Sequence, residues 1–189
     1  MKITLAALVL TLSLTTTAFA QNSVNLKLDA EEILTLKKIA DNKYEKISDN
    51  VIGNISLSVD ANGIKQTLVN QAINDSNARN DFTLELTGKN IVRVTDLKEA
   101  INQEVQANIQ KTFFGKLKTI SIDSKTMEAL YAASLQKAGI DVLKNLNINQ
   151  GAGTLTSKIN SSSLECNADG DLLVCNQTQE LDLIITEKN

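Results

Sequence analysis

The sequence contains no histidine, no proline and no tryptophan, and it has two cysteines in 189 residues. The absence of histidine excludes His-based nucleophilic triads, histidine general bases and His-ligated metal sites. Two cysteines are too few for a four-thiolate zinc site or for a conventional iron–sulfur cluster. The composition therefore predicts no cofactor and no bound metal ion.

The charges nearly balance, with 19 Lys and Arg against 22 Asp and Glu and a net charge of -3. Mild acidity argues against a polyanionic partner. A nucleic-acid surface also needs clustered basic residues with stacking aromatics. Beyond residue 20 the aromatic residues are few, namely Tyr44, Phe82, Phe113, Phe114 and Tyr131. We therefore expect no nucleic-acid partner.

The first twenty residues have the three-part pattern of a cleaved export signal. Lys2 supplies the positive charge, residues 3–14 form the apolar segment, and Ala18 and Ala20 give the small residues before a cleavage point. The apolar segment is too short to cross roughly 30 Å of hydrocarbon, and no later stretch is long and apolar enough. We expect a signal peptide at 1–20, cleavage after Ala20, one domain at 21–189, and a periplasmic or secreted location.

The two cysteines, Cys166 and Cys175, are expected to form a disulfide across a β-hairpin. An exported chain meets an oxidising environment, and Gly170-Asp171 lies midway between the two cysteines. A type II′ turn at these two residues makes Cys166 and Cys175 a facing, non-hydrogen-bonded pair, which a disulfide can bridge. We interpret the bridge as structural, worth about 2.5 kcal/mol, because catalytic dithiols more often have C-x-x-C spacing.

Apolar periodicity predicts an α+β fold, with a mainly antiparallel sheet and two or three amphipathic helices. Helical spacing predicts helices over residues 64–73, 96–109 and 124–138, the last ending at Gly139 in a Schellman-type stop. Residues 30–40 stay open between a short helix, begun by the Asp29/Glu32 spacing, and a strand.

Strands are predicted where apolar and polar residues alternate. The segments before the last helix are 24–28, 55–59, 82–86, 91–94 and 118–123, with a break at residues 61–63. Residues 141–149 remain open between helix and strand. After the turn at 151–153, segments 155–159, 164–168, 172–177 and 181–185 predict a C-terminal β-meander, which the disulfide staples.

Two other features are candidate sites. Phe113-Phe114 precedes Gly115, and the pair is either an exposed apolar contact for a lipid or partner, or contributes at least one ring to the core. Ser134 and Lys137 fit S-x-x-K, and Ser48-Asp49-Asn50 fits S-D-N, as in serine penicillin-binding enzymes. The order is reversed and K-T-G is missing, so chance is the simpler interpretation.

These observations favour an exported, soluble, non-enzymatic binding or interaction protein of unidentified ligand. The alternative is a periplasmic or secreted carrier of an apolar, lipid-like ligand, because a sheet with helices on one face can enclose a cavity. A hydrolase based on Ser134 and Lys137 or on carboxylates is a third hypothesis without a complete motif. The expected partner is a protein or an apolar small molecule.

Overall fold

The computed structural model describes residues 23–61, 64–145 and 154–186. The predicted signal peptide at 1–20, the break at 62–63 and the segment 146–153 lie outside the described residues. The described part has eleven strands and one helix: β1 (Ser23–Ala40), β2 (Lys43–Ala61), β3 (Ile64–Asn77), β4 (Phe82–Gly88), β5 (Ile91–Asp96), β6 (Ile101–Gln106), β7 (Asn108–Lys111), β8 (Leu117–Ile122), α1 (Ser124–Asn145), β9 (Thr154–Ser161), β10 (Leu164–Asp169) and β11 (Leu172–Thr186).

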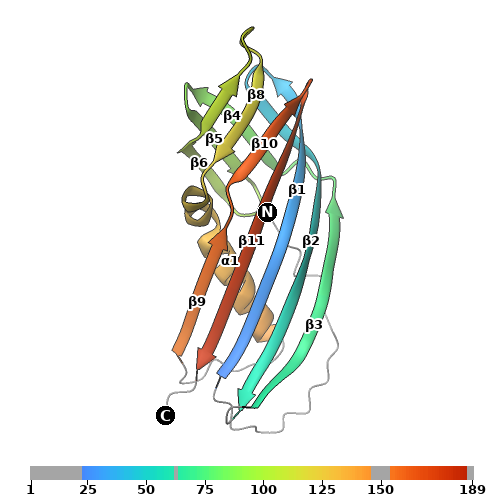
Figure 1. Cartoon of the computed structure of the whole chain (residues 1–189), viewed down its shortest axis with the longest axis vertical. Coiled ribbons are helices and arrows are strands. Elements are labelled where there is room, and N and C mark those ends of the chain that lie inside the picture. Colours follow the sequence, from blue (N-terminus) through green and yellow to red (C-terminus); the bar gives the residue numbers. More distant parts are fainter. Residues whose placement is uncertain (1–22, 62–63, 146–153, 187–189) are drawn as a thin grey trace.

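All eleven strands belong to one sheet in the order β6-β5-β4-β2-β1-β11-β10-β8-β7, with β3 beside β2 and β9 beside β11. Every pairing is antiparallel. β6 and β7 stand at opposite ends of this order, yet Ala107 alone separates them in the chain. The sheet therefore curls into a nearly closed roll at one end of the molecule (Figure 1).

At the other end the sheet is open, and β9, β11, β1, β2 and β3 lie side by side (Figure 1). Helix α1 packs here against β9 and β11. Gly139 is buried in the helix, and a Cβ added to it would lie 2.2 Å from Leu183 Cδ1 and 2.9 Å from Leu181 Cδ2. The predicted helix end at Gly139 is wrong: α1 continues to Asn145, and the glycine permits close contact with β11.

The interior contains two apolar clusters, one inside the roll and one under the open sheet. β1 contributes to both, since every second side chain from Val24 to Leu36 is buried. Between the clusters the inward positions are polar. Glu32 on β1 stands opposite Gln177 on β11, and both are buried.

The predicted α+β class is wrong, because most of the predicted helices are strands. Residues 30–40 belong to β1, where burial alternates with a period of two. Asp29 and Glu32, whose spacing resembled a capping box, lie on opposite faces of the strand: Asp29 is exposed and Glu32 is buried. Pairing with β2 and β11 along nearly its whole length holds this segment extended.

The predicted helix at 64–73 is strand β3, and the predicted helix at 96–109 is a turn followed by β6 and β7. β3 pairs with the long strand β2 from Ile64 to Asn77 and has Val69 as its one buried side chain. Asp96 accepts backbone hydrogen bonds from Lys98 and Glu99, at 3.0 and 3.2 Å, as an N-cap would. The chain then reverses and pairs with β5 instead of continuing as a helix.

The predicted C-terminal meander also differs from the structure in its strand boundaries and pairing. The predicted strands 172–177 and 181–185 are parts of one strand, β11. β10 pairs with the first part of β11, and β9 pairs with its second part. The three strands therefore form one long hairpin with an interrupted first arm, while the antiparallel character of the sheet is confirmed.

Candidate functional site

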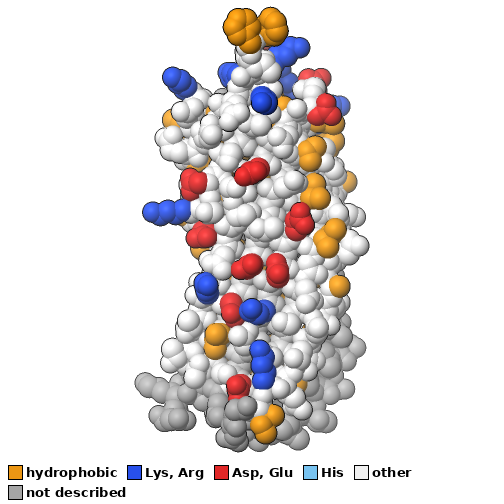
Figure 2. All heavy atoms as spheres, in the orientation of Figure 1, with side chains coloured by type: hydrophobic (Ala, Val, Ile, Leu, Met, Phe, Trp, Pro, Cys, Tyr) orange, Lys and Arg blue, Asp and Glu red, His pale blue; other side chains and the backbone are white. Residues whose placement is uncertain are grey.

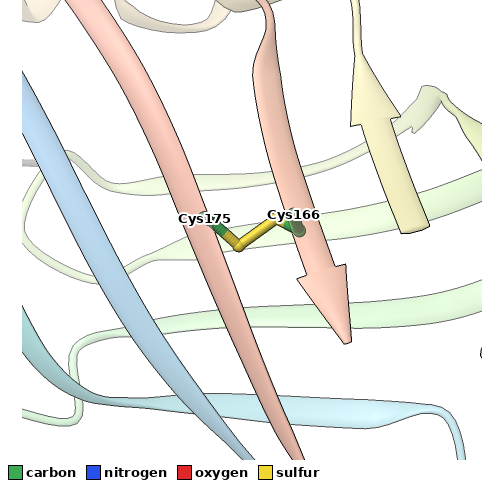
Figure 3. The surroundings of a disulfide bond; sticks show 2 residues. All are labelled: Cys166 and Cys175. Carbon is green, nitrogen blue, oxygen red and sulfur yellow. A yellow bond between two sulfur atoms is a disulfide. The ribbon is translucent and has the colours of Figure 1, made fainter. Parts of the chain in front are cut away.

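The disulfide between Cys166 and Cys175 is confirmed, and Figure 3 shows it joining β10 to β11. The register is the predicted one: Asp169 faces Leu172 at the turn, and Cys166 faces Cys175. Gly170 has φ +61°, the left-handed conformation that the first central residue of a type II′ turn requires. Both cysteines are buried in the apolar cluster of the roll. Shielded sulfur atoms in an apolar core are typical of a structural bridge.

The tip of the β7–β8 hairpin is a defined turn over residues 112–116, which we call the Phe tip. Thr112 N–H donates to Lys116 O at 2.7 Å, and Gly115 N–H donates to Thr112 O at 2.9 Å. Lys116 N–H also donates to the Thr112 hydroxyl at 3.2 Å. Gly115 has φ +76°, so the turn has the form of a tight turn followed by a left-handed glycine.

The two central residues of the Phe tip point into solvent. Phe113 is 98% exposed and Phe114 is 86% exposed. Their rings meet edge to face with centroids 5.6 Å apart. The turn stands at one end of the long axis in Figure 1, and Figure 2 shows a hydrophobic pair at that end. The structure thus favours the exposed contact over the alternative in which one ring joins the core.

Lysine is the one charged residue type close to the Phe tip along the hairpin. Lys111, Lys116 and Lys118 are all exposed, and residues 105–122 contain no Asp or Glu. None of the three takes part in the ion pairs that join described residues. The hairpin therefore combines two exposed aromatic rings with a local charge of +3.

A second candidate site lies inside the fold, where four charged side chains are linked by successive ion pairs. Lys46 is 3% exposed and contacts both Asp49 and Asp81, with 2.6 Å between Lys46 Nζ and Asp81 Oδ1. Lys98 contacts the other oxygen of Asp81 at 3.1 Å. Burial opposes both charges, but the hydrogen bonds and charges of the two carboxylates together raise the pKa of Lys46, and those of Lys46 and Lys98 together lower the pKa of Asp81.

Glu32 lies next to this chain of ion pairs. Its side chain is 3% exposed, and its Oε2 atom has no hydrogen-bond partner. Glu32, Lys46, Tyr131 and Gln177 help to line a cavity of about 10 Å³, roughly the space of one water molecule. Burial away from solvent raises the pKa of Glu32 to about 7, with Asp49 and Asp96 raising it further and Lys46 opposing them.

Tyr131 lies on α1 and faces these buried polar residues. We call the whole group the polar layer, and its members are Glu32, Lys46, Asp49, Asp81, Asp96, Lys98 and Tyr131. The Tyr131 hydroxyl donates to Asp96 Oδ2 at 3.2 Å, and both residues are buried. Burial, together with the nearby Asp96 carboxylate, raises the pKa of Tyr131 well above its ordinary value. The ion pairs of this layer thus tie β2 to the loop before β4, and the hydrogen bond of Tyr131 ties α1 to β5, with Glu32 of β1 buried beside them.

Sequence reasoning did not single out Glu32, Lys46, Asp81 or Asp96 as interior residues. A signal for Glu32 was present, because it stands in the period-two row Leu28, Ala30, Glu32, Leu34. Lys46 and Asp49 flank a register shift between β1 and β2, which turns both side chains inward. Such an irregularity leaves no clear trace in composition.

The structure does not bring the serine-enzyme motifs together as a site. On α1, Ser134 is partly buried and Lys137 is exposed, and no hydrogen bond joins these two described side chains. Asp49 of the S-D-N triplet is instead a buried partner of Lys46. Within the described ranges, no three acidic or cysteine side chains are arranged to hold a metal ion.

Comparisons of the chain with protein families, with curated proteins and with solved structures gave no match. In the part of the chain that the structure describes, no helix combines the length and the apolar character needed to cross a membrane.

Proposed function

We propose that the chain is an exported, non-enzymatic binding protein that contacts its target through the Phe tip. The observation that carries this proposal is the exposure of two adjacent phenylalanines on a hydrogen-bonded turn. Single exposed apolar side chains are ordinary, but contiguous ones held at a protruding position are typical of contact surfaces. The Phe tip is therefore the best-supported contact site on the described surface.

Export is supported by two independent features. The first twenty residues have the pattern of a cleaved signal peptide. The chain's two cysteines are joined in a disulfide, and disulfides persist in oxidising compartments such as the periplasm and the cell exterior. Both features fit a protein that works outside the cytoplasm.

The interior gives less support to a carrier of apolar ligands. The cavity beside Glu32 has about 10 Å³ and is lined partly by charged groups, whereas ligand pockets have roughly 300–1,000 Å³ and are lined mainly by apolar side chains. Two hollows of about 350 and 300 Å³ reach this size, but their linings are mainly polar. The apolar side chains around the cavity beside Glu32 pack into the cluster of the roll. Contact through the outer surface is thus favoured over transport of a ligand inside the fold.

Site-specific photo-crosslinking in the cells that make the protein tests this proposal. A photoreactive phenylalanine analogue is placed at Phe113, and the matched control places it at Leu97, which is 71% exposed on a different turn. We expect adducts from position 113 and none from position 97. Absence of adducts at position 113, or the same adducts from both positions, would contradict the proposal.

A further inference from the structure

We propose that the Phe tip binds an anionic lipid surface, with the two phenylalanine rings entering the interface and the lysines contacting lipid head groups. This inference rests on the proposed function, because it names the chemistry of the partner that the same site contacts. It is carried by the position of the tip, by the charge around it and by the small area that it offers.

The position of the tip suits a flat, fluid surface. The β7–β8 turn stands at one end of the long axis, so it meets a membrane before any other described element when the molecule approaches along that axis (Figure 1). Phe113 and Phe114 are adjacent and almost fully exposed. Both rings can therefore leave water together without a change in the fold.

The charge around the tip fits an anionic partner. The hairpin has Lys111, Lys116 and Lys118 and no acidic residue between positions 105 and 122. Since the whole chain has a net charge of -3, the residues outside this segment together have a charge of -6. An anionic surface thus attracts the hairpin and repels the rest of the molecule, which orients the tip toward the lipid.

A protein partner fits the same site less well. An interface of standard size buries about 800 Å² on each partner, and a phenylalanine side chain buries roughly 150–250 Å². The two rings at the end of one narrow hairpin offer only part of that area. A lipid interface needs no matching pocket, and lysine stems can extend along it while their ammonium groups stay hydrated.

The turn is also prepared for binding before it meets the surface. Three hydrogen bonds hold residues 112–116, and Gly115 has the left-handed backbone conformation that the turn requires. Less conformational freedom is then lost when the rings are immobilised. The hairpin needs no folding step on contact.

The test measures sedimentation of the disulfide-bonded protein with lipid vesicles. One set contains phosphatidylcholine alone, and the other also contains phosphatidylglycerol. We expect binding to the anionic vesicles that weakens as salt is raised, because salt screens exposed charges. Phe113→Ser with Phe114→Ser should lower the partition coefficient at least about a hundredfold, from the loss of two buried rings.

Lysine variants measure the contribution of electrostatic attraction to binding, separately from that of the two rings. Replacing Lys111, Lys116 and Lys118 with Gln should lower binding to anionic vesicles by about fivefold per lysine, with no change on phosphatidylcholine alone. The matched control changes Lys137 and Lys144, two exposed lysines on α1, to Gln. All of these side chains are exposed, so the thermal midpoints of the variants should equal that of the original protein.

Equal binding of the original protein and the Phe variant, or equal loss in the tip and control lysine variants, would overturn the inference. Absence of vesicle binding would also overturn it. If position 113 still gave protein adducts in the crosslinking experiment, the proposed function would stand with a protein partner. If position 113 gave no adducts of any kind, the proposed function itself would fail.

Discussion

The ammonium group of Lys46 lies 2.6 Å from a carboxylate oxygen of Asp81 inside the sheet, and the same ammonium contacts Asp49. Two carboxylates and one ammonium thus share a site that solvent barely reaches, and Lys98 supplies the balancing positive charge at 3.1 Å from Asp81. Removing one of these charged side chains leaves the charge of its partner less well neutralised. The loss of stability after such a substitution is therefore the most direct test of the polar layer.

Lys46→Ala should destabilise the fold by about 3 kcal/mol, because it leaves the buried Asp49 without its partner and the partly buried Asp81 with Lys98 alone. Urea denaturation followed by circular dichroism measures the effect. The control is Lys144→Ala, which removes an exposed ion pair with Asp141 and should change stability by no more than about 0.5 kcal/mol. Similar losses in the two variants would contradict the buried ion-pair chain.

Glu32 should make stability fall as the pH rises. The unfolded chain releases this proton near its ordinary pKa of 4.5, whereas the folded protein holds it until about pH 7. Between these values the folded state binds more protons, so the free energy of unfolding decreases with rising pH. A shift of this size corresponds to about 3 kcal/mol, present at pH 4 and lost by pH 8.

Glu32→Gln removes this titration and keeps the shape of the side chain. The stability difference between the variant and the original protein should therefore grow by about 3 kcal/mol in favour of the variant from pH 4 to pH 8. Parallel stability curves for the two proteins would show that Glu32 titrates in the fold as it does in the unfolded chain.

The disulfide should contribute about 2.5 kcal/mol, because it closes a loop of about ten residues in the unfolded chain. Cys166→Ala with Cys175→Ala should lower the urea midpoint, and treating the original protein with a reductant should lower it similarly. Mass spectrometry should show the original protein two hydrogens lighter before reduction. An unchanged midpoint after complete reduction would contradict the stabilising role.

Gly139→Ala should destabilise the protein, although alanine favours helix by about 1 kcal/mol over glycine. The new Cβ would lie 2.2 Å from a methyl group of Leu183, which is fully buried. Overpacking of this kind costs about 1–3 kcal/mol. In a Leu183→Ala background the closest methyl group is gone and Leu181 Cδ2 at 2.9 Å remains, so the same substitution should there destabilise the protein less.

Local pattern predicted the parts of the fold in which one short hairpin decides the structure. The β10–β11 register follows from Gly170-Asp171 and the cysteine spacing, and the β4–β5 hairpin follows from alternation around Gly88. The local sequence pattern gave the wrong structure for residues 64–73, where apolar residues at helical spacing lie on strand β3. Pairing with the distant part of β2 decides that segment, and a local window contains no information on such a partner.

The candidate sites likewise differ in how much of them the local sequence could predict. The sequence left Phe113-Phe114 open between an exposed contact and a ring in the core, and only the position of the turn beyond the sheet shows that both rings are exposed. The partnership of Lys46 with Asp81 joins residues 35 positions apart on β2 and on the loop before β4. It depends on the curl of the sheet, so spacing in the sequence could not predict it.

The fluorescence of a single tryptophan at the Phe tip gives the most direct measurement, because the chain has no tryptophan of its own. In Phe113→Trp the emission should shift to shorter wavelength when vesicles containing phosphatidylglycerol are added, and an aqueous quencher should lose access to the indole. Leu97→Trp should show neither change. An emission spectrum of Phe113→Trp that stays that of a water-exposed indole with these vesicles would contradict lipid contact through the tip.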